Sequence, residues 1–287
     1  MRVVRADVMG MCFGVRDALK IINRVEEPQT VTIHGQLVHN EVVLDRLESK
    51  GFAMADESAR ADLPETPVVL ITAHGISDKE RARLTSAGKQ LIDTTCPLVT
   101  RVHQAALKLR DEGYHVLVIG RRGHVEVQGI IEDLDSFYVV QNEDEVITFP
   151  SKRLGIVCQT TAASRNVARL RDVIAERNPD AEIKFVDTVC LPTKDHQRSV
   201  ERLLGEVDAV VVVGGHNSNN TRELVTLCLE RGIPAVHVQS ADSLDPDWFA
   251  GYETVGLTAG TSTLDSTIDE VHQALLRLSV GVESRAH

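Results

Sequence analysis

The feature that most constrains this chain is an internal pattern that recurs about every 90 residues. Asp93-Thr94-Thr95-Cys96 returns as Asp187-Thr188-Val189-Cys190, and each copy follows a strand-like segment and precedes a helical pattern. A third copy near the N-terminus, which ends at Cys12, has the same order of strand, cysteine and helix. Because the three copies divide the 287 residues almost evenly, we expect three similar modules rather than two unequal domains.

Each copy continues through the same series of elements. After the helix that follows the cysteine, the pattern predicts a strand with a polar loop, a helix, a second strand, and a third strand with its own polar loop. Such alternation is typical of parallel α/β layers. We therefore expect three α/β modules related by pseudo-threefold symmetry. They cover residues 13–95, 96–189 and 190–275, with 1–12 completing the third module and 281–287 forming a polar tail.

The composition disfavours several classes of protein. There are 31 Lys and Arg against 42 Asp and Glu, so the formal net charge is -11, whereas general binders of nucleic acid or membrane surfaces need basic faces. No apolar run approaches the roughly 18 residues of a membrane span, and the charged N-terminus does not resemble a signal peptide. We therefore expect a cytoplasmic protein with no nucleic-acid or membrane partner, whose reduced thiols are free to bind metal.

The polar loops of the three modules predict where a ligand binds. Open parallel sheets bind ligands outside the carboxyl ends of their strands. The cysteine and both polar loops of every module follow strands. If the modules surround a pseudo-threefold axis, all nine loops converge on one central cavity.

One cysteine per module stands at an equivalent position, namely Cys12, Cys96 and Cys190. Three thiolates would hold an iron–sulfur cluster and leave one iron open to a substrate, and soft thiolates suit either iron–sulfur clusters or zinc. Ordinary buried cysteines are the alternative. That alternative fits Cys158 and Cys228 better, because they lie on an apolar strand pattern and an apolar helix pattern.

The predicted loops carry mostly neutral hydrogen-bond donors, which suit a small, multiply charged anion such as a diphosphate. The candidates are His39, His74, His124, Thr160, Ser218, Asn219, Asn220 and Ser262. For any one of them a turn or helix cap is an equally good explanation. Neither a P-loop nor a Gly-x-Gly-x-x-Gly motif occurs, so no nicotinamide cofactor is expected. The histidines outside these loops, including His103, are interpreted as structural or surface groups.

Glu126 is the one carboxylate beside a histidine in these loops, two residues after His124. A carboxyl group near a cluster and an anion should have a raised pKa, which makes Glu126 a candidate general acid. The alternative is a first-turn glutamate that the helix dipole favours.

Taken in order, these motifs resemble the 4-hydroxy-3-methylbut-2-enyl diphosphate reductases (the LytB/IspH family), which catalyse the last step of the methylerythritol phosphate route to isoprenoids. The resemblance covers nearly the whole chain and rests on residues 9–15, 38–40, 73–75, 93–97, 123–127, 159–161, 217–221 and 259–262. It implies a trefoil of three α/β modules around one [4Fe-4S] cluster per chain, held by Cys12, Cys96 and Cys190.

The resemblance also implies a role for each candidate residue. Five residues match the family's diphosphate contacts, namely His39, His74, Ser218, Asn220 and Ser262. Asn219 stands where the family often has Ser or Gly. His124 and Thr160 match positions near the hydroxyl end of the substrate, and Glu126 matches the proton donor.

The implied reaction is a reductive dehydration. Two electrons arrive singly from ferredoxin or flavodoxin, the C4 hydroxyl leaves as water, and an allyl intermediate is protonated to isopentenyl or dimethylallyl diphosphate. The sequence departs from the family at Val125, where Pro is usual, and at Pro192 and His196, which replace Ala and Arg after the third cysteine. Two alternatives therefore stay open: a paralogue that uses the cluster on another small anion, and a non-catalytic metal-binding or sensing protein, with zinc as one possible metal.

Overall fold

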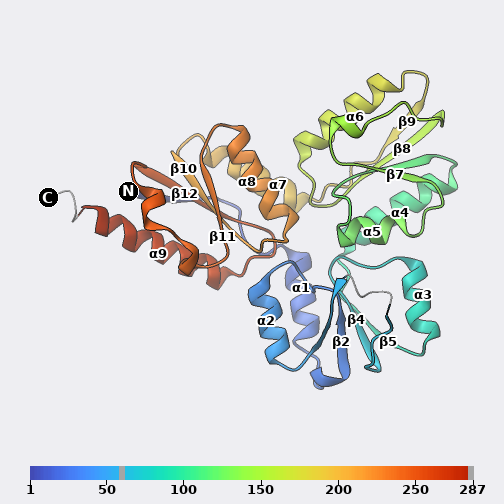
Figure 1. The fold of residues 1–287 in the computed structure, drawn as a ribbon, viewed down its shortest axis with the longest axis horizontal. Coiled ribbons are helices and arrows are strands. Elements are labelled where there is room, and N and C mark those ends of the chain that lie inside the picture. Colours follow the sequence, from blue (N-terminus) through green and yellow to red (C-terminus); the bar gives the residue numbers. More distant parts are fainter. Residues whose placement is uncertain (58–61, 284–287) are drawn as a thin grey trace. The chain divides into compact units, whose positions relative to one another are not determined.

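The structure is a computed structural model that describes residues 1–57 and 62–283. The chain divides into two compact units, and Figure 1 labels helices and strands of both. Unit 1 consists of Met1–Phe13, His39–Glu41 and the chain from Leu191 onward, and unit 2 consists of Gly14–Val38 and Val42–Cys190.

Unit 1 contains one parallel sheet of four strands. Their order is β1 (Arg2–Arg5), β12 (Thr254–Ala259), β10 (Ala209–Val213) and β11 (Ala235–Val238). Arg2 of β1 lies opposite Thr254 of β12, and every strand pair is parallel. The N-terminal strand is therefore an edge of the sheet whose other strands come from the last third of the chain.

Unit 2 contains two further parallel sheets of four strands. The first has the order β3 (Ala53–Ala55), β2 (Val31–His34), β4 (Val68–Ile71) and β5 (Gln90–Asp93). The second has the order β7 (Phe137–Val140), β6 (His115–Ile119), β8 (Arg153–Cys158) and β9 (Glu182–Phe185). With β1 counted as the fourth strand after β10, β11 and β12, all three sheets have the same strand order. Across each sheet, the second strand comes first, followed by the first, the third and the fourth. Three four-stranded parallel sheets confirm the predicted α/β fold class, while the module boundaries at 95/96 and 189/190 stay a prediction.

Helices alternate with these strands. In unit 2 they are α1 (Phe13–Ile22), α2 (Glu41–Ser49), α3 (Asp78–Ser86), α4 (Pro97–Asp111), α5 (Val125–Ile131) and α6 (Ser164–Arg177), although the first residues of α1 and α2 belong to unit 1. In unit 1 they are α7 (Leu191–Leu203), α8 (Asn219–Glu230) and α9 (Asp265–Glu283). Short 3-10 helices include Pro28–Thr30, Glu143–Glu145, Ala241–Ser243 and Pro246–Phe249.

The strand β6 illustrates how one of these sheets is covered on both faces. Successive side chains of a strand point to opposite faces. Val116 and Val118 pack with apolar residues of α4 and α5, whereas Leu117 and Ile119 pack with apolar residues of α6. The nearly continuous apolar run of this strand, which is typical of buried parallel sheets, thus fills two cores at once.

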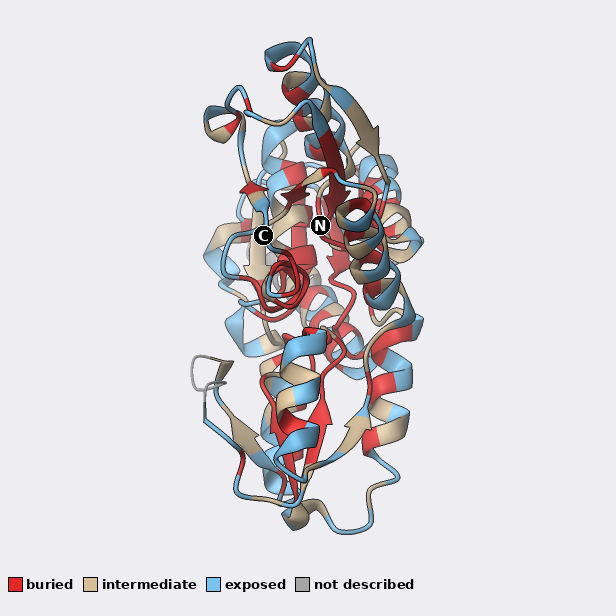
Figure 2. Cartoon of the chain, turned by 90° about the vertical axis from the view of Figure 1, so that its right-hand side faces the viewer, coloured by how far each residue is buried: buried red, intermediate tan, exposed pale blue. Residues whose placement is uncertain are grey.

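The strand β10 has the same arrangement in unit 1. Val210 and Val212 pack with α7 and α8, and Val211 and Val213 pack with α9. Buried residues accordingly gather in the strands and on the helix faces turned toward them, while the outer helix faces are exposed (Figure 2).

The N-terminal strand agrees with the prediction from the sequence, whereas the last helix extends into the predicted polar tail. The first strand forms as the sequence suggests, but α9 continues to Glu283 and includes the first three residues of the predicted polar tail. A glycine costs a helix only about 1 kcal/mol relative to alanine, so Gly281 does not end it. The rest of the predicted tail, 284–287, lies outside the described residues. None of the described helices is both long enough and apolar enough to cross a membrane.

Candidate functional site

The three repeat-equivalent cysteines lie at the N-terminal ends of helices. Cys96 is the N-cap of α4, and Cys12 and Cys190 directly precede α1 and α7. All three are cysteines of intermediate exposure that form no disulfide. The positive end of a helix dipole favours an anion such as a thiolate, so each position suits a metal-binding sulfur.

Each of these cysteines is anchored by its backbone in the same way. Its amide N–H donates to a carbonyl in the polar loop after the third strand of its own sheet. The pairs are Cys12 with Thr261 at 3.0 Å, Cys96 with Ala73 at 3.1 Å, and Cys190 with Thr160 at 2.9 Å. The repeat in the sequence is therefore a repeat in backbone geometry.

The Asp-Thr-x-Cys motif builds the turn that leads to two of the cysteines. The Thr94 hydroxyl donates to the Ile71 carbonyl at 2.6 Å, and the Thr188 hydroxyl donates to the Cys158 carbonyl at the same distance. The aspartates accept the amide N–H two residues later, from Thr95 in one copy and from Val189 in the other. The motif thus ties each strand end to its neighbouring strand, a role that the sequence alone did not assign to the threonines.

The two remaining cysteines are core residues, as predicted. Cys158 lies in β8 and Cys228 in α8, and both are 0 % exposed. Burial raises the pKa of the Cys228 thiol to about 12. A thiol that stays protonated is a poor metal ligand, so Cys228 is a core residue rather than a candidate ligand.

Glu126 lies in the first turn of α5 and is only 2 % exposed. Burial raises its pKa to about 7, although two hydrogen bonds from Thr160 act in the opposite direction. The Thr160 amide donates to Oε1 at 2.6 Å and the Thr160 hydroxyl donates to Oε2 at 2.8 Å. A carboxyl group with this pKa exchanges its proton near neutral pH, as a general acid requires.

Thr160 connects this carboxyl group to a cysteine. Its N–H and hydroxyl hold Glu126, while its carbonyl accepts the amide N–H of Cys190. The candidate acid and one candidate metal ligand are therefore positioned by a single residue, which follows β8.

His124 is the N-cap of α5, where its Nδ1 accepts the amide N–H of Glu126 at 3.1 Å. An accepting Nδ1 leaves the ring proton of a neutral imidazole on Nε2, which is then a donor. The ring packs edge-on against His74, with 5.7 Å between ring centroids. His74 and Glu126 line one cavity of unit 2. In unit 2 the structure therefore brings together His74, His124, Glu126, Thr160, Cys96 and Cys190 through adjoining loops.

The predicted anion-binding residues of unit 1 also lie in adjoining loops. The Asn40 amide donates to the Ser262 carbonyl at 2.8 Å, and the Ser262 hydroxyl donates to the His39 carbonyl at 3.2 Å. Asn220 accepts the Thr261 amide N–H at Oδ1, at 3.0 Å. Asn40, which was not among the predicted site residues, links the loops through its amide.

Ser218 and Asn220 differ in what their side chains already do. Ser218 is the N-cap of α8 and accepts the Thr221 amide N–H, so the capping explanation holds for this residue. Asn220 is 1 % exposed, and its Nδ2 has no hydrogen-bond partner among the residues that the structure describes. Asn219, the first residue of α8, is 7 % exposed. A buried amide donor without an acceptor is costly unless a ligand accepts from it.

Two glycines permit the close approach of these loops. A Cβ at Gly215 would lie 2.4 Å from the His39 carbonyl oxygen, and one at Gly260 would lie 2.1 Å from the Thr221 hydroxyl. Neither distance is sterically possible. The glycines are therefore needed to bring the His39 and Ser262 loops against α8.

The three departures from the family pattern fit the fold. Val125 is the first residue of α5, a position where proline is favoured but not required. Pro192 lies in the first turn of α7, where proline is tolerated. His196 is 3 % exposed, and its Nδ1 lies 3.1 Å from the Ala259 carbonyl oxygen. The histidine that replaces arginine thus has a hydrogen-bond partner, the carbonyl oxygen of Ala259, which directly precedes Gly260.

Comparison with known proteins gives one consistent result. The family described as LytB protein matches residues 3–276. The 4-hydroxy-3-methylbut-2-enyl diphosphate reductase of Dehalococcoides mccartyi is 36 % identical, with 98 % of this chain and 100 % of that protein covered. The reductase of Methylibium petroleiphilum is 35 % identical, with 96 % of this chain and 85 % of that protein covered.

A solved structure shares the fold. The E-1-hydroxy-2-methyl-but-2-enyl-4-diphosphate reductase of Plasmodium falciparum superposes with a TM-score of 0.88 at 27 % sequence identity, covering 96 % of this chain and 87 % of that one. The similarity in sequence and in structure therefore extends over all three sheets.

Proposed function

This chain belongs to the LytB protein family, and we propose that it catalyses the reductive dehydration of 4-hydroxy-3-methylbut-2-enyl diphosphate to isopentenyl and dimethylallyl diphosphate. In this reaction the substrate takes up two electrons and two protons, and its hydroxyl group leaves as water. The geometry that carries the proposal is the buried Glu126 carboxyl group, held by Thr160, whose carbonyl in turn holds Cys190.

We propose that Cys12, Cys96 and Cys190 hold one [4Fe-4S] cluster per chain. Three observations support the fit: the cysteines form no disulfide, they are partly exposed, and each lies at the start of a helix. When bound, the cluster would supply the electrons and an iron without a protein ligand for the substrate hydroxyl. Cys158 and Cys228, by contrast, are fully buried.

Glu126 is the proposed general acid. With a pKa of about 7, a substantial fraction of the carboxyl groups is protonated at neutral pH. After the proton leaves for the departing hydroxyl, the Thr160 amide and hydroxyl stabilise the carboxylate. His124, with its proton on Nε2, and Thr160 are proposed to orient the hydroxyl end of the substrate.

The diphosphate is proposed to bind to neutral donors. These are His39, His74, Ser218, Asn220 and Ser262, with Asn219 beside them. The best support comes from Asn220, whose buried Nδ2 has no acceptor within the described chain. Oxygen atoms of a diphosphate would satisfy such a donor without requiring a basic residue.

The electrons are proposed to come from ferredoxin or flavodoxin, since these carriers deliver them one at a time. We infer that the enzyme works in the cytoplasm, where the cysteines needed for the cluster stay reduced.

Replacement of single cysteines tests the proposed cofactor. Protein produced anaerobically with iron should be brown, and Cys12→Ser, Cys96→Ser or Cys190→Ser should lose the visible absorption of an iron–sulfur cluster. Cys228→Ala is the matched control and should keep it. A colourless wild type, or zinc in place of iron on metal analysis, would contradict the proposal and favour a non-catalytic metal-binding protein.

The substrate is tested separately. A chain that keeps its cluster but does not turn over 4-hydroxy-3-methylbut-2-enyl diphosphate would instead be a paralogue that acts on another small anion. His196, which replaces the family's arginine, is the residue where such a difference would be sought first.

A further inference from the structure

We propose that His103 passes protons from solvent to Glu126 through the cavity that both residues line, a role that rests on the proposed reductive dehydration. The need for such a route follows from burial and stoichiometry. Each turnover consumes two protons, and Glu126 is 2 % exposed. A buried acid that gives up a proton in every cycle must be reloaded through a defined path.

A cavity of about 80 Å³ in unit 2 provides the space for this path. Its walls include His74 and Glu126 together with Asp78, Arg81 and His103. One water needs only about 10–15 Å³ of such volume and several polar partners, so the cavity has room for water beside His74, His103 and Glu126. Water in the cavity would therefore connect His103 with the Glu126 carboxyl group.

His103 lies on α4 and lines the cavity, and its side chain is 15 % exposed, although the ring atom Nε2 is itself buried. Its Nε2 lies 2.8 Å from Oδ2 of Asp133, close enough for an ion pair. The ring N–H is not aligned along this line, so within the described chain the contact is electrostatic rather than a well-formed hydrogen bond. Imidazole is the side chain best suited to exchanging protons near neutral pH.

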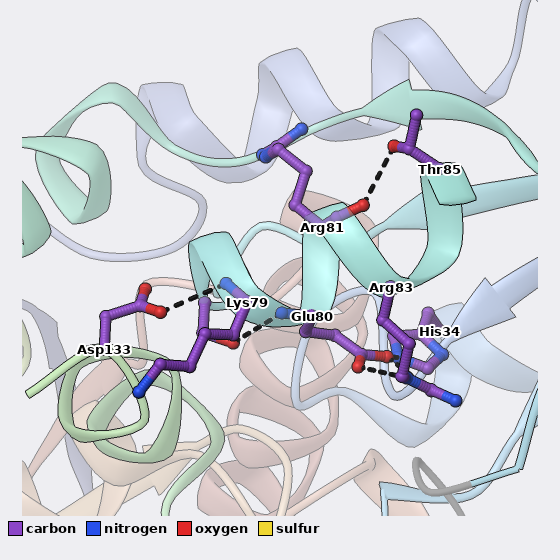
Figure 3. A network of polar contacts seen from close by, with 8 residues as sticks. His34, Lys79, Glu80, Arg81, Arg83, Thr85 and Asp133 are labelled. Atoms are coloured by element: carbon purple, nitrogen blue, oxygen red, sulfur yellow. Dashed lines mark hydrogen bonds and ion pairs between the residues drawn. The ribbon is translucent and has the colours of Figure 1, made fainter. Parts of the chain in front are cut away.

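Asp133 is itself held in place, as its contacts with the start of α3 show. The Asp78 and Lys79 amide N–H groups donate to its two carboxylate oxygens at 2.6 Å and 3.1 Å, and Figure 3 shows the second of these bonds. The carboxylate is 5 % exposed. Two backbone N–H groups therefore fix the Asp133 carboxylate in place beside the His103 ring.

The transfer moves protons only. An imidazolium N–H bond of His103 breaks as water in the cavity takes the proton, and a proton of that water forms the O–H bond of the Glu126 carboxyl group. His103 then takes up another proton from solvent. The charged groups around the ring are Asp78, Arg81 and Asp133, and His74 and Glu126 face the same cavity.

Chemical rescue tests this role with the cluster-loaded enzyme. His103→Gln should lower kcat by about tenfold to a hundredfold, the upper figure being the low end of what a positioned proton-transfer group contributes, and should leave KM and the cluster absorption unchanged. In His103→Ala, added imidazole should restore kcat in a concentration-dependent manner. The matched control is His115→Ala, because His115 is half-buried in the same unit but does not line the cavity. Its activity should not respond to imidazole.

A second measurement does not depend on turnover. In the protein without cluster, the infrared C=O band of the protonated Glu126 carboxyl group is identified by its loss in Glu126→Gln. Its shift on rapid mixing with D2O should be slower in His103→Gln than in wild type and in His115→Ala.

The outcomes separate the two proposals. If wild type does not turn over the diphosphate, the proposed function fails. Two results would overturn this inference while wild type turns over the diphosphate. In the first, His103→Gln keeps full kcat. In the second, His103→Gln loses thermal stability and imidazole restores no activity in His103→Ala, so that His103 only ties α4 to Asp133 structurally.

Discussion

The raised pKa of Glu126 predicts that Glu126→Gln stabilises the protein at alkaline pH while it abolishes most of the activity. Burial holds the pKa at about 7 in the folded state, against an ordinary value of 4.5. The folded chain therefore keeps a proton that the unfolded chain loses. The resulting stability is fully present below pH 4.5 and is lost as the pH rises through 7.

The size of this effect follows from the two pKa values. At about 1.4 kcal/mol per pH unit, the difference between 4.5 and about 7 corresponds to about 3 kcal/mol in the free energy of unfolding. Most of this stabilisation, about 2 to 3 kcal/mol, is lost between pH 5 and pH 8. A glutamine is neutral at every pH, and its amide can accept the Thr160 N–H and donate to the Thr160 hydroxyl. Glu126→Gln should therefore match wild type near pH 5 and exceed it by about 2 to 3 kcal/mol at pH 8.

Denaturant titrations of the cluster-free protein at pH 5, 6.5 and 8 measure this difference. The exposed Glu176, on α6 of the same unit, gives the matched control Glu176→Gln, which should leave the pH dependence of wild type unchanged. Parallel stability curves for wild type and Glu126→Gln would refute the assignment of a protonated, buried carboxyl group.

Three further predictions concern other contacts. Thr160→Val removes one hydrogen bond to the charged form of Glu126, worth about 1.5 to 3 kcal/mol, so the alkaline limb of the kcat/KM profile should move up by about one to two pH units; an unmoved limb would separate Thr160 from the acid. Asn220→Asp places a carboxylate where a diphosphate is proposed to bind, and steady-state kinetics should give a KM raised at least about tenfold, whereas an unchanged KM would place the diphosphate elsewhere. Glu80→Ala removes the partner of the fully buried His34, 2.9 Å from its Nε2 (Figure 3), and should cost about 1 to 3 kcal/mol in denaturant unfolding. No loss there would mean that His34 is satisfied without Glu80.

The repeat made most of the fold predictable. Three copies of one motif, each between a strand and a helix, indicated three parallel α/β sheets, and the apolar runs such as Ala209–Val213 indicated buried central strands. The end of α9 was not predictable in the same way. Gly281 interrupts the pattern in the sequence, yet the helix continues past it because glycine lowers helix stability only modestly.

Features of the candidate site were predictable where they depend on residues that are neighbours in the sequence. The position of Glu126 beside His124 follows from the sequence. The direction of its pKa shift was predicted as well, but from a neighbouring cluster and anion, whereas burial raises the pKa in the structure. The contact with Thr160 does not follow from the sequence, because 34 residues separate the two and only the pairing of β6 with β8 brings their loops together. The sequence places each candidate in a loop, but the strand pairing decides which loops meet.

The contact between His103 and Asp133 was not predictable for the same reason. His103 has no counterpart in the other repeats, and Asp133 lies 30 residues further on, beyond the end of α5. Thr94 and Thr188 were likewise seen only as part of a motif. Their hydroxyl contacts with Ile71 and Cys158 depend on the register between neighbouring strands, which hydrophobic pattern alone does not fix.

The most direct test of the proposed function is an anaerobic assay of the purified, iron-loaded protein with 4-hydroxy-3-methylbut-2-enyl diphosphate and a reduced viologen dye. Oxidation of the dye that depends on the substrate, with isopentenyl and dimethylallyl diphosphate as products and two electrons consumed per product, is the predicted result. A brown, cluster-containing wild type that oxidises no dye and forms neither product would contradict it.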